Sequence, residues 1–157
     1  MMAKPFDETL DEAGARNTET APLRSPLDRL LGYRLRRASM VMMGDLHEQL
    51  RPYQLSVGEA SLLILVGANP DCRQSDVGRA LAIKRANLTP LVGRLKLRGL
   101  IADAPIDGRS LSLSLTETGR ALETELLAKI EASDRKFRDR LPLDEAALIT
   151  ALAALDR

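Results

Sequence analysis

Apolar residues recur in the middle of the chain with the period of an amphipathic helix. Within residues 84–100 they fall at i, i+3, i+4 and i+7, which marks one face of an α-helix. These positions are Leu88, Leu91, Val92 and Leu95. The opposite face combines small residues with the polar residues that border them. That face comprises Ala86, Asn87, Thr89, Pro90, Gly93, Arg94 and Lys96.

The segments around this helix predict a helix-turn-helix followed by a hairpin. Residues 72–81 predict a shorter helix and residues 82–83 a turn, and Gly99 follows the second helix as a C′ glycine does. Leucines alternate with serines over residues 111–115, the pattern of a half-buried strand, and strand candidates flank Asp107 and Gly108. Arg109 therefore falls at or near the hairpin tip.

A long helix is predicted before this region, starting near Ser25 or Pro26 and ending before Pro52. Two of its faces are partly apolar, so we expect it to be buried on two sides. One face carries Leu27, Leu30, Leu31, Ala38, Val41 and Met42. The other carries Tyr33, Arg36, Met40, Met43, His47 and Leu50.

Three more helices are predicted. Ser56 and Glu59 form a capping box that begins a helix, which stops at residues 69–70. Thr116 caps a long helix that ends around Arg140. Pro142 opens a last helix, rich in Ala and Leu, and we expect it to form a dimer interface with the first helix and the long fifth helix. The buried side of the long fifth helix is marked by Leu122, Leu126, Ile130 and Phe137.

This order of elements predicts a mainly α fold with a small β-hairpin wing (α+β), a winged helix-turn-helix with a helical dimerisation domain. We expect residues 56–116 to form the winged helix-turn-helix, and residues 25–55 and 117–157 to form the dimerisation domain. Residues 1–24 are polar and acidic without periodicity, and are expected to be a disordered or loosely attached tail.

Positive charge is concentrated in the helix-turn-helix. Between Arg73 and Arg98 there are seven basic residues and one acidic residue, a net charge of +6, whereas the whole chain carries +1. Such a cluster is typical of proteins that contact the DNA phosphate backbone. The small residues on the exposed helix face would allow close approach to the major groove, where Asn87 and Arg94 suit the edges of adenine and guanine. The alternative is a solvated helix pair packed on a core.

Composition narrows the functional classes. The chain has 157 residues, 45% of them apolar, and a single cysteine, Cys72, which excludes an intramolecular disulfide and fits a reducing cytoplasm. No apolar run approaches the roughly 18 residues that a membrane span needs, and no signal peptide is evident. There is no phosphate-binding loop, nucleophile elbow or metal-ligand spacing, so neither an enzyme nor a cofactor is predicted.

The segments QSDVGRAL, LTPLVGRLKLRGLI and IDGRSLSLSLTETGRAL resemble the MarR (multiple-antibiotic-resistance regulator) family, and the resemblance extends over residues 27–155. It implies a homodimer that binds palindromic operators in double-stranded DNA and releases them on binding small, often phenolic, ligands. By this resemblance Gln74 and Ser75 meet phosphates, while Asp107 orients Arg109 in the minor groove. The residues placed at the major groove are Arg85, Ala86, Asn87, Thr89, Pro90 and Arg94.

The chain departs from the family pattern at three positions. Ala82 stands where the turn usually has Gly, and Arg73 where the helix cap usually has Thr. Pro90 lies within the recognition helix, where an interior proline costs about 3 kcal/mol. If Asn87 caps the helix, Pro90 falls in its first turn, and we expect a loose or kinked start.

The segments KRANLTPLV and DGRS also resemble a subgroup of the family that senses hydroxycinnamate-type aromatic acids or their CoA thioesters. In that case Arg36 would hold a carboxylate or phosphate, Tyr33, Met40 and Met43 an aromatic ring, and His47 a polar contact. Ordinary packing between the two domains is the alternative. The functional alternative is a winged-helix module that docks on another protein without binding DNA.

Overall fold

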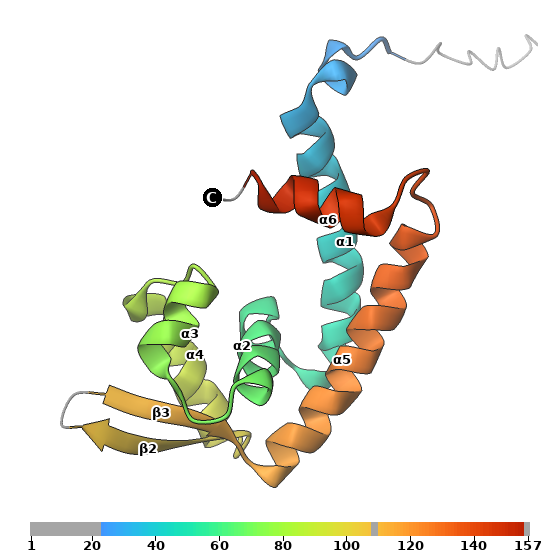
Figure 1. Ribbon diagram of the computed structural model, residues 1–157. Coiled ribbons are helices and arrows are strands. Elements are labelled where there is room, and N and C mark those ends of the chain that lie inside the picture. The colour runs from blue at the N-terminus through green and yellow to red at the C-terminus, as the bar shows by residue number, and fades with distance from the viewer. Residues whose placement is uncertain (1–22, 108–109, 156–157) are drawn as a thin grey trace, which may run out of the picture.

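The computed structural model describes residues 23–107 and 110–155 (Figure 1). Its elements are η1 (Pro26–Arg29), α1 (Leu31–Leu50), η2 (Arg51–Tyr53), α2 (Val57–Ala68), β1 (Cys72–Arg73), α3 (Gln74–Ala80), α4 (Arg85–Leu97), β2 (Ile101–Asp107), β3 (Ser110–Leu115), α5 (Glu117–Arg138) and α6 (Glu145–Ala153). The predicted fold class is confirmed: a mainly helical chain carries a small antiparallel sheet with strand order β1-β3-β2. No described helix is long and apolar enough to cross a membrane.

Helix α2 lies at the centre of the core. The predicted capping box is present: the Ser56 hydroxyl accepts from the Glu59 amide at 3.2 Å, and the Glu59 carboxylate accepts from the Ser56 amide at 2.8 Å. Leu62, Leu63 and Val66 on α2 are fully buried. They belong to one apolar cluster that includes residues of α3, α4, the sheet and α5, so a single core joins the elements around α2.

Helix α4 packs on this core through the predicted stripe. Leu88, Val92 and Leu95 are buried, and Leu91 is half-buried. The helix begins at Arg85 after Lys84, so the expectation that Asn87 caps it is wrong. Pro90 consequently lies in the helix interior, where it cannot donate the usual backbone hydrogen bond. A loose or kinked start to the helix stays a prediction.

The turn between α3 and α4 is tight. Ala82 has a φ angle of 53°, in the left-handed region that favours glycine. This conformation explains why Gly is the usual residue at this turn position. Gly78 on α3 is buried, and an added Cβ there would lie 3.0 Å from a methyl group of Leu88 and 3.2 Å from the Ile83 carbonyl oxygen. The glycine therefore lets α3 and α4 approach closely.

The hairpin strands pair as expected, with a bulge near the tip. Ile101 pairs with Leu115, and the register shifts between Pro105 and Asp107. Leu113 and Leu115 are buried, whereas Leu111 is partly exposed. Gly99 follows α4 with φ 68, as predicted for a glycine at that end.

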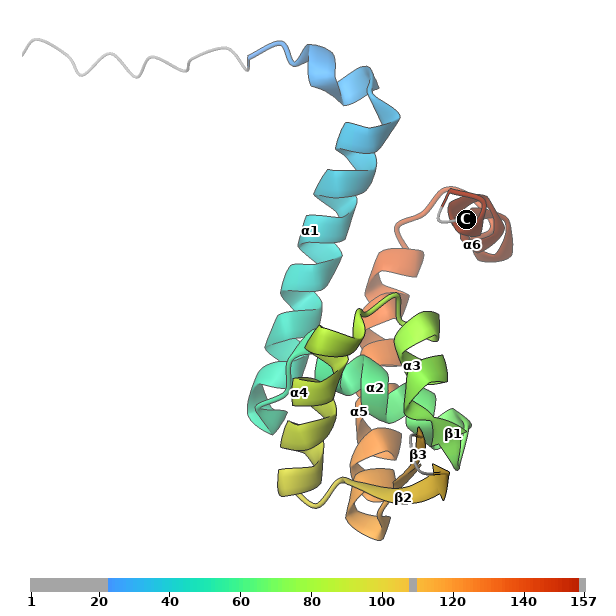
Figure 2. The same ribbon diagram turned by 90° about the vertical axis from the view of Figure 1, so that its left-hand side faces the viewer.

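The long helices α1 and α5 lie side by side, whereas α6 lies away from α1 (Figure 2). An ion pair of 2.7 Å between Arg138 and Glu145 joins the end of α5 to the start of α6. Asp45 on α1 accepts a hydrogen bond from the buried Ser133 hydroxyl and lies 3.6 Å from the Lys136 ammonium group. Three predicted boundaries need correction. The first helix is interrupted at Leu30, which is extended. The helix predicted over residues 72–81 begins only at Gln74, because Cys72 and Arg73 form strand β1. Helix α6 begins at Glu145 after its cap Asp144 rather than at Pro142.

Much apolar surface remains uncovered on these helices. Of the α1 residues, only Leu50 is buried, although both of its partly apolar faces were expected to be covered. On α6 no residue is buried. The uncovered apolar side chains include Leu27, Leu30, Leu31, Met40, Val41, Leu143, Ile149 and Leu155.

The contact between α5 and Leu100, which lies between α4 and β2, requires Gly119. A Cβ added there would overlap the carbonyl oxygen of Leu100, which is backbone and cannot swing aside. We therefore expect Gly119→Ala to lower the free energy of unfolding by about 3 kcal/mol, the upper range for overpacking. Gly93→Ala on α4 is the matched control, because a Cβ there meets nothing within 4 Å. It should be neutral or stabilising by up to about 1 kcal/mol. Urea unfolding of both variants measures the difference, and equal stabilities would contradict the assignment.

Candidate nucleic-acid interface

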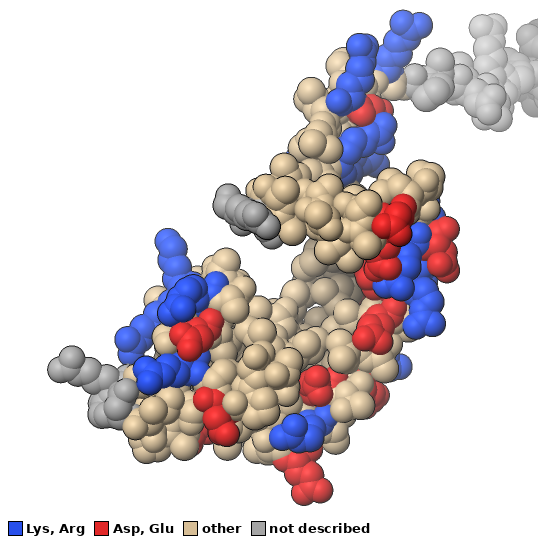
Figure 3. Space-filling model, viewed as in Figure 1, with Lys and Arg blue, Asp and Glu red and all other residues tan. Residues whose placement is uncertain are grey.

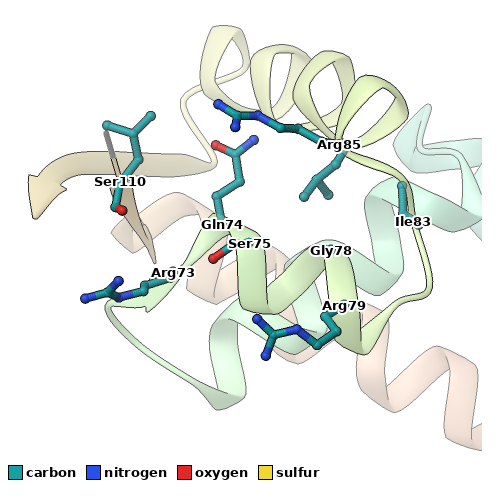
Figure 4. Close-up of a pocket in the computed structure, with 10 residues that line it drawn as sticks. Arg73, Gln74, Ser75, Gly78, Arg79, Ile83, Arg85 and Ser110 are labelled. Carbon is teal, nitrogen blue, oxygen red and sulfur yellow. The ribbon is translucent and has the colours of Figure 1, made fainter. Parts of the chain in front are cut away.

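A pocket of about 290 Å³ lies where α3, the start of α4 and strand β3 meet (Figure 4). Arg73, Arg79 and Arg85 contribute guanidinium groups around it, while Gln74 and Ser75 stand at the start of α3. Lys and Arg side chains gather on this side of the molecule (Figure 3). The pocket therefore joins the predicted phosphate contacts to the predicted reading helix in one cationic surface.

The predicted major-groove residues lie on the exposed face of α4. Arg85, Ala86, Asn87, Thr89 and Pro90 are all exposed and occupy its first two turns. The Thr89 hydroxyl donates to the Arg85 carbonyl at 3.1 Å and lies 3.5 Å from the Gln74 side-chain nitrogen. The first two turns of α4 thus present small and polar side chains outward, with Gln74 of α3 close by.

The second half of α4 is different, because its basic residues have partners inside the protein. Arg94 Nε lies 2.7 Å from Glu59 of α2, and Lys96 Nζ lies 2.5 Å from Asp103 of β2. Arg98, just after the helix, donates to the carbonyl oxygens of Tyr53 and Gln54. Arg94 keeps its predicted place on the outer face, and its side chain is 53% exposed, but its Nε is already held by Glu59.

The remaining positive charge clusters near the pocket. Arg79 pairs with Asp76 at 3.2 Å. Arg73, Lys84 and Arg85 have no acidic partner within ion-pair distance among residues 23–106 and 110–155, whose side chains the structure describes. The sequence identified Arg73 as a departure at the helix cap, and Lys84 only as part of a basic segment. They are distinguished by their position at the starts of α3 and α4, where no carboxylate of the described side chains pairs with them.

Glu59 is a carboxylate that the protein keeps ionised in a buried position. Burial raises its pKa, but the hydrogen bonds from Ser56 and the guanidinium of Arg94 outweigh that effect and lower the pKa below its usual value. The sequence identified Glu59 only as a helix cap. Its contact with Arg94, 35 positions further along the chain, depends on how α2 and α4 pack.

The predicted wing pair is only partly described. Asp107 ends β2 opposite Ser110, which places it beside the hairpin tip. Arg109 lies outside the described residues, so its insertion into a minor groove and its orientation by Asp107 stay predictions.

The predicted ligand residues lie along α1. Four of them are exposed: Arg36, Met40, Met43 and His47. Tyr33 is half-buried, and the Arg37 guanidinium carbon lies over its ring, 6.0 Å from the ring centre. His47 Nδ1 lies 2.6 Å from the Met43 carbonyl oxygen, which can only accept, so Nδ1 carries the proton. Neither the pocket at α3 nor the shallow hollow between α1 and α5 includes these residues. Their role in binding a ligand stays a prediction.

Cys72 pairs with Leu113 in the sheet, and its sulfur lies 3.9 Å from the Leu113 carbonyl oxygen. Partial burial, together with nearby Asp71 and Asp76, raises the pKa of the thiol. A protonated thiol is a poor nucleophile, which favours the structural role over a reactive one.

An exposed polar helix face beside a cationic pocket and a hairpin defines a winged helix-turn-helix protein of the type that binds duplex DNA. Comparisons with known proteins agree with this class. Residues 53–110 match the model of the MarR family. The chain is 28% identical over 116 residues to the HTH-type transcriptional repressor Rv2887 of Mycobacterium tuberculosis (strain ATCC 25618 / H37Rv), covering 73% of this chain and 84% of that protein.

Solved structures are similar over most of the chain. Transcriptional repressor CouR bound to a 23-mer DNA duplex is 31% identical with a TM-score of 0.78, covering 87% of this chain and 100% of that one. CouR bound to p-coumaroyl-CoA is 29% identical with a TM-score of 0.75, covering 87% and 99%. The chain belongs to the MarR family of transcriptional regulators.

The pairing pattern of the basic residues makes a testable distinction. Arg85→Ala should reduce the slope of log affinity against log salt for duplex DNA by about 1, because one phosphate contact is lost. Arg98→Ala should leave the slope unchanged, because Arg98 is held by carbonyl oxygens of the protein. Fluorescence anisotropy at several salt concentrations measures both slopes. A reduced slope for Arg98→Ala, or an unchanged slope for Arg85→Ala, would contradict this assignment.

Proposed function

We propose that the protein is a homodimeric transcriptional repressor that binds a palindromic operator and leaves it when a small aromatic acid or its CoA thioester binds. The observation that carries the proposal is the exposed first half of α4 beside the cationic pocket, on a fold similar over 87% of the chain to DNA-bound CouR. A repressor needs no catalytic group, and we propose no enzymatic activity. We expect it to act in the cytoplasm, where its operator would be.

The dimer accounts for the uncovered apolar surface. The start of α1 and the whole of α6 expose leucine and isoleucine side chains, whose contact with water is unfavourable. Both segments lie at the same end of the molecule, away from the sheet (Figures 1 and 2). A second copy joined there would cover these faces and leave both α4 helices outward, with residues 56–116 as the DNA-binding domain and residues 25–55 and 117–157 as the dimerisation domain.

The effector proposal rests on a different surface. An uncharged hollow lies between the α3–α4 side and the α1–α6 end of the molecule (Figure 3). CouR, similar over most of the chain, binds p-coumaroyl-CoA. Tyr33, Met40 and Met43 could contact an aromatic ring, and Arg36 and His47 its polar groups. Such a ligand can release DNA only as far as it binds the released arrangement more tightly than the bound one.

One observation favours the alternative of a protein-docking module. Leu97, at the end of α4, is 90% exposed, and Ile106 on the wing is 44% exposed. These side chains lie at the C-terminal end of α4 and on strand β2, and a protein partner could cover them. The two functions differ in their dependence on salt, because phosphate contacts weaken steeply as salt rises.

The test measures binding to the DNA upstream of the protein's own gene by anisotropy, with a scrambled duplex as control. We expect tighter binding to the upstream DNA, a steep loss of affinity with salt, and weaker binding by Arg109→Ala. Addition of p-coumaroyl-CoA should raise the melting temperature and release the DNA, whereas CoA alone should do neither. No DNA binding at low salt would refute the repressor and favour the docking module.

A further inference from the structure

Glu59 makes more contacts than a helix cap requires. Its side chain is only 7% exposed, and both of its carboxylate oxygens are used. One oxygen accepts from the Ser56 amide at 2.8 Å and from the Ser56 hydroxyl at 2.7 Å. The other accepts from Arg94 Nε at 2.7 Å. A single buried carboxylate therefore joins the first turn of α2 to the second half of α4.

This bond restricts α4 in a way that the apolar stripe does not. Burial of Leu88, Val92 and Leu95 is favourable for any rotation or slide that keeps them covered, because apolar attraction has no direction. A charge-assisted hydrogen bond is directional and short. Rotating α4 would pull Arg94 from Glu59 and leave a buried charge without its cation, which is strongly unfavourable.

Neighbouring contacts make α4 sensitive to this bond. Gly58 lies next to Glu59, and an added Cβ there would be 3.4 Å from a methyl group of Leu91, so α4 approaches α2 closely at this point. Two residues beyond Arg94, Lys96 is bound to Asp103 of the wing. The second half of α4 is thus fixed on two sides, while the outer face of its first two turns is exposed to solvent.

We propose that Glu59 is a positioning residue for DNA recognition, which holds Arg94 and thereby sets the angle at which α4 presents Arg85, Asn87 and Thr89. The proposal rests on the proposed function for its DNA readout. In this proposal Arg94 orients α4 within the protein, a role additional to the major-groove contact that the sequence predicted for it. Specific reading then depends on the first two turns of α4.

Glu59→Gln is the informative variant. The side-chain oxygen of the glutamine can still accept hydrogen bonds from Ser56. Its NH2 group, which only donates, cannot accept the hydrogen bond from Arg94. We expect operator affinity to fall about tenfold, the usual effect of losing a hydrogen bond to a charged group, while affinity for a scrambled duplex and the salt slope stay unchanged. A variant that was merely less stable would lose affinity for both duplexes in proportion to its unfolded fraction.

Two control variants separate positioning from stability. Ser56→Ala removes the hydroxyl from the capping box but leaves the Glu59–Arg94 contact, so it should lower stability and keep the ratio of operator to scrambled affinity. Glu48→Gln breaks an ion pair of the same 2.7 Å length between two exposed residues, Glu48 and Arg51. This variant should change neither the stability nor the ratio of operator to scrambled affinity. If either control lowers the ratio as much as Glu59→Gln, the proposal is wrong.

A double-mutant cycle with Arg94→Met tests whether Glu59 acts through Arg94. The double variant should bind the operator no more weakly than the weaker single variant, because both remove the same contact. Additive losses would show that Glu59 acts otherwise. A salt slope reduced by about 1 for Arg94→Met, with normal operator binding by Glu59→Gln, would place Arg94 on DNA and overturn the proposal.

Amide hydrogen exchange gives a readout that needs no DNA. Glu59→Gln should speed exchange in the second half of α4 at least tenfold, whereas Ser56→Ala should act mainly on the start of α2. If the wild-type chain binds neither duplex, the proposed function fails. The rate of hydrogen exchange in α4 then still tests whether Glu59 holds this helix in position. Unchanged exchange in α4 of Glu59→Gln would refute it.

Discussion

The packing of α4 against α2 is the constraint on which the rest of the structure depends. The helix has one apolar stripe, so burying that stripe fixes which residues face outward. The same packing brings the Arg94 guanidinium to the buried Glu59 carboxylate. The fold thus uses a general apolar attraction to place α4 and one directional contact to fix its angle.

The distribution of charge follows from this arrangement. The segment that carries +6 along the sequence does not present all of that charge to a ligand. Its C-terminal basic residues neutralise carboxylates of α2 and β2 or bind carbonyl oxygens, and they hold the helix and the wing in place. Arg73 and Arg85, which have no acidic partner among the described side chains, lie at the pocket between α3 and the start of α4, where a phosphate backbone could lie beside the reading residues.

Local patterns made most of the fold predictable. The capping box at Ser56, the stripe on α4, the alternating leucines of β3 and Gly99 are all signals within a few residues. The capping box, the buried stripe and the left-handed Gly99 are present as expected. Strand β3 also forms, but Leu111 is exposed and Ser112 is buried, so its burial alternates only in part. The errors lie where the pattern is weak. The apolar periodicity continues through Leu30, so it could not predict that this residue is extended. The apolar faces of the first helix also could not show that a single chain leaves them uncovered. The Glu59–Arg94 contact joins distant segments, which periodicity cannot show.

The central claim is that two copies of the chain, joined at the α1–α6 end, place two α4 helices in successive major grooves. Hydroxyl-radical footprinting on the upstream DNA tests this most directly. The account predicts two symmetrical protected patches whose centres lie about one helical turn, roughly 10 base pairs, apart. A single protected patch, or uniform protection along the duplex, would contradict it.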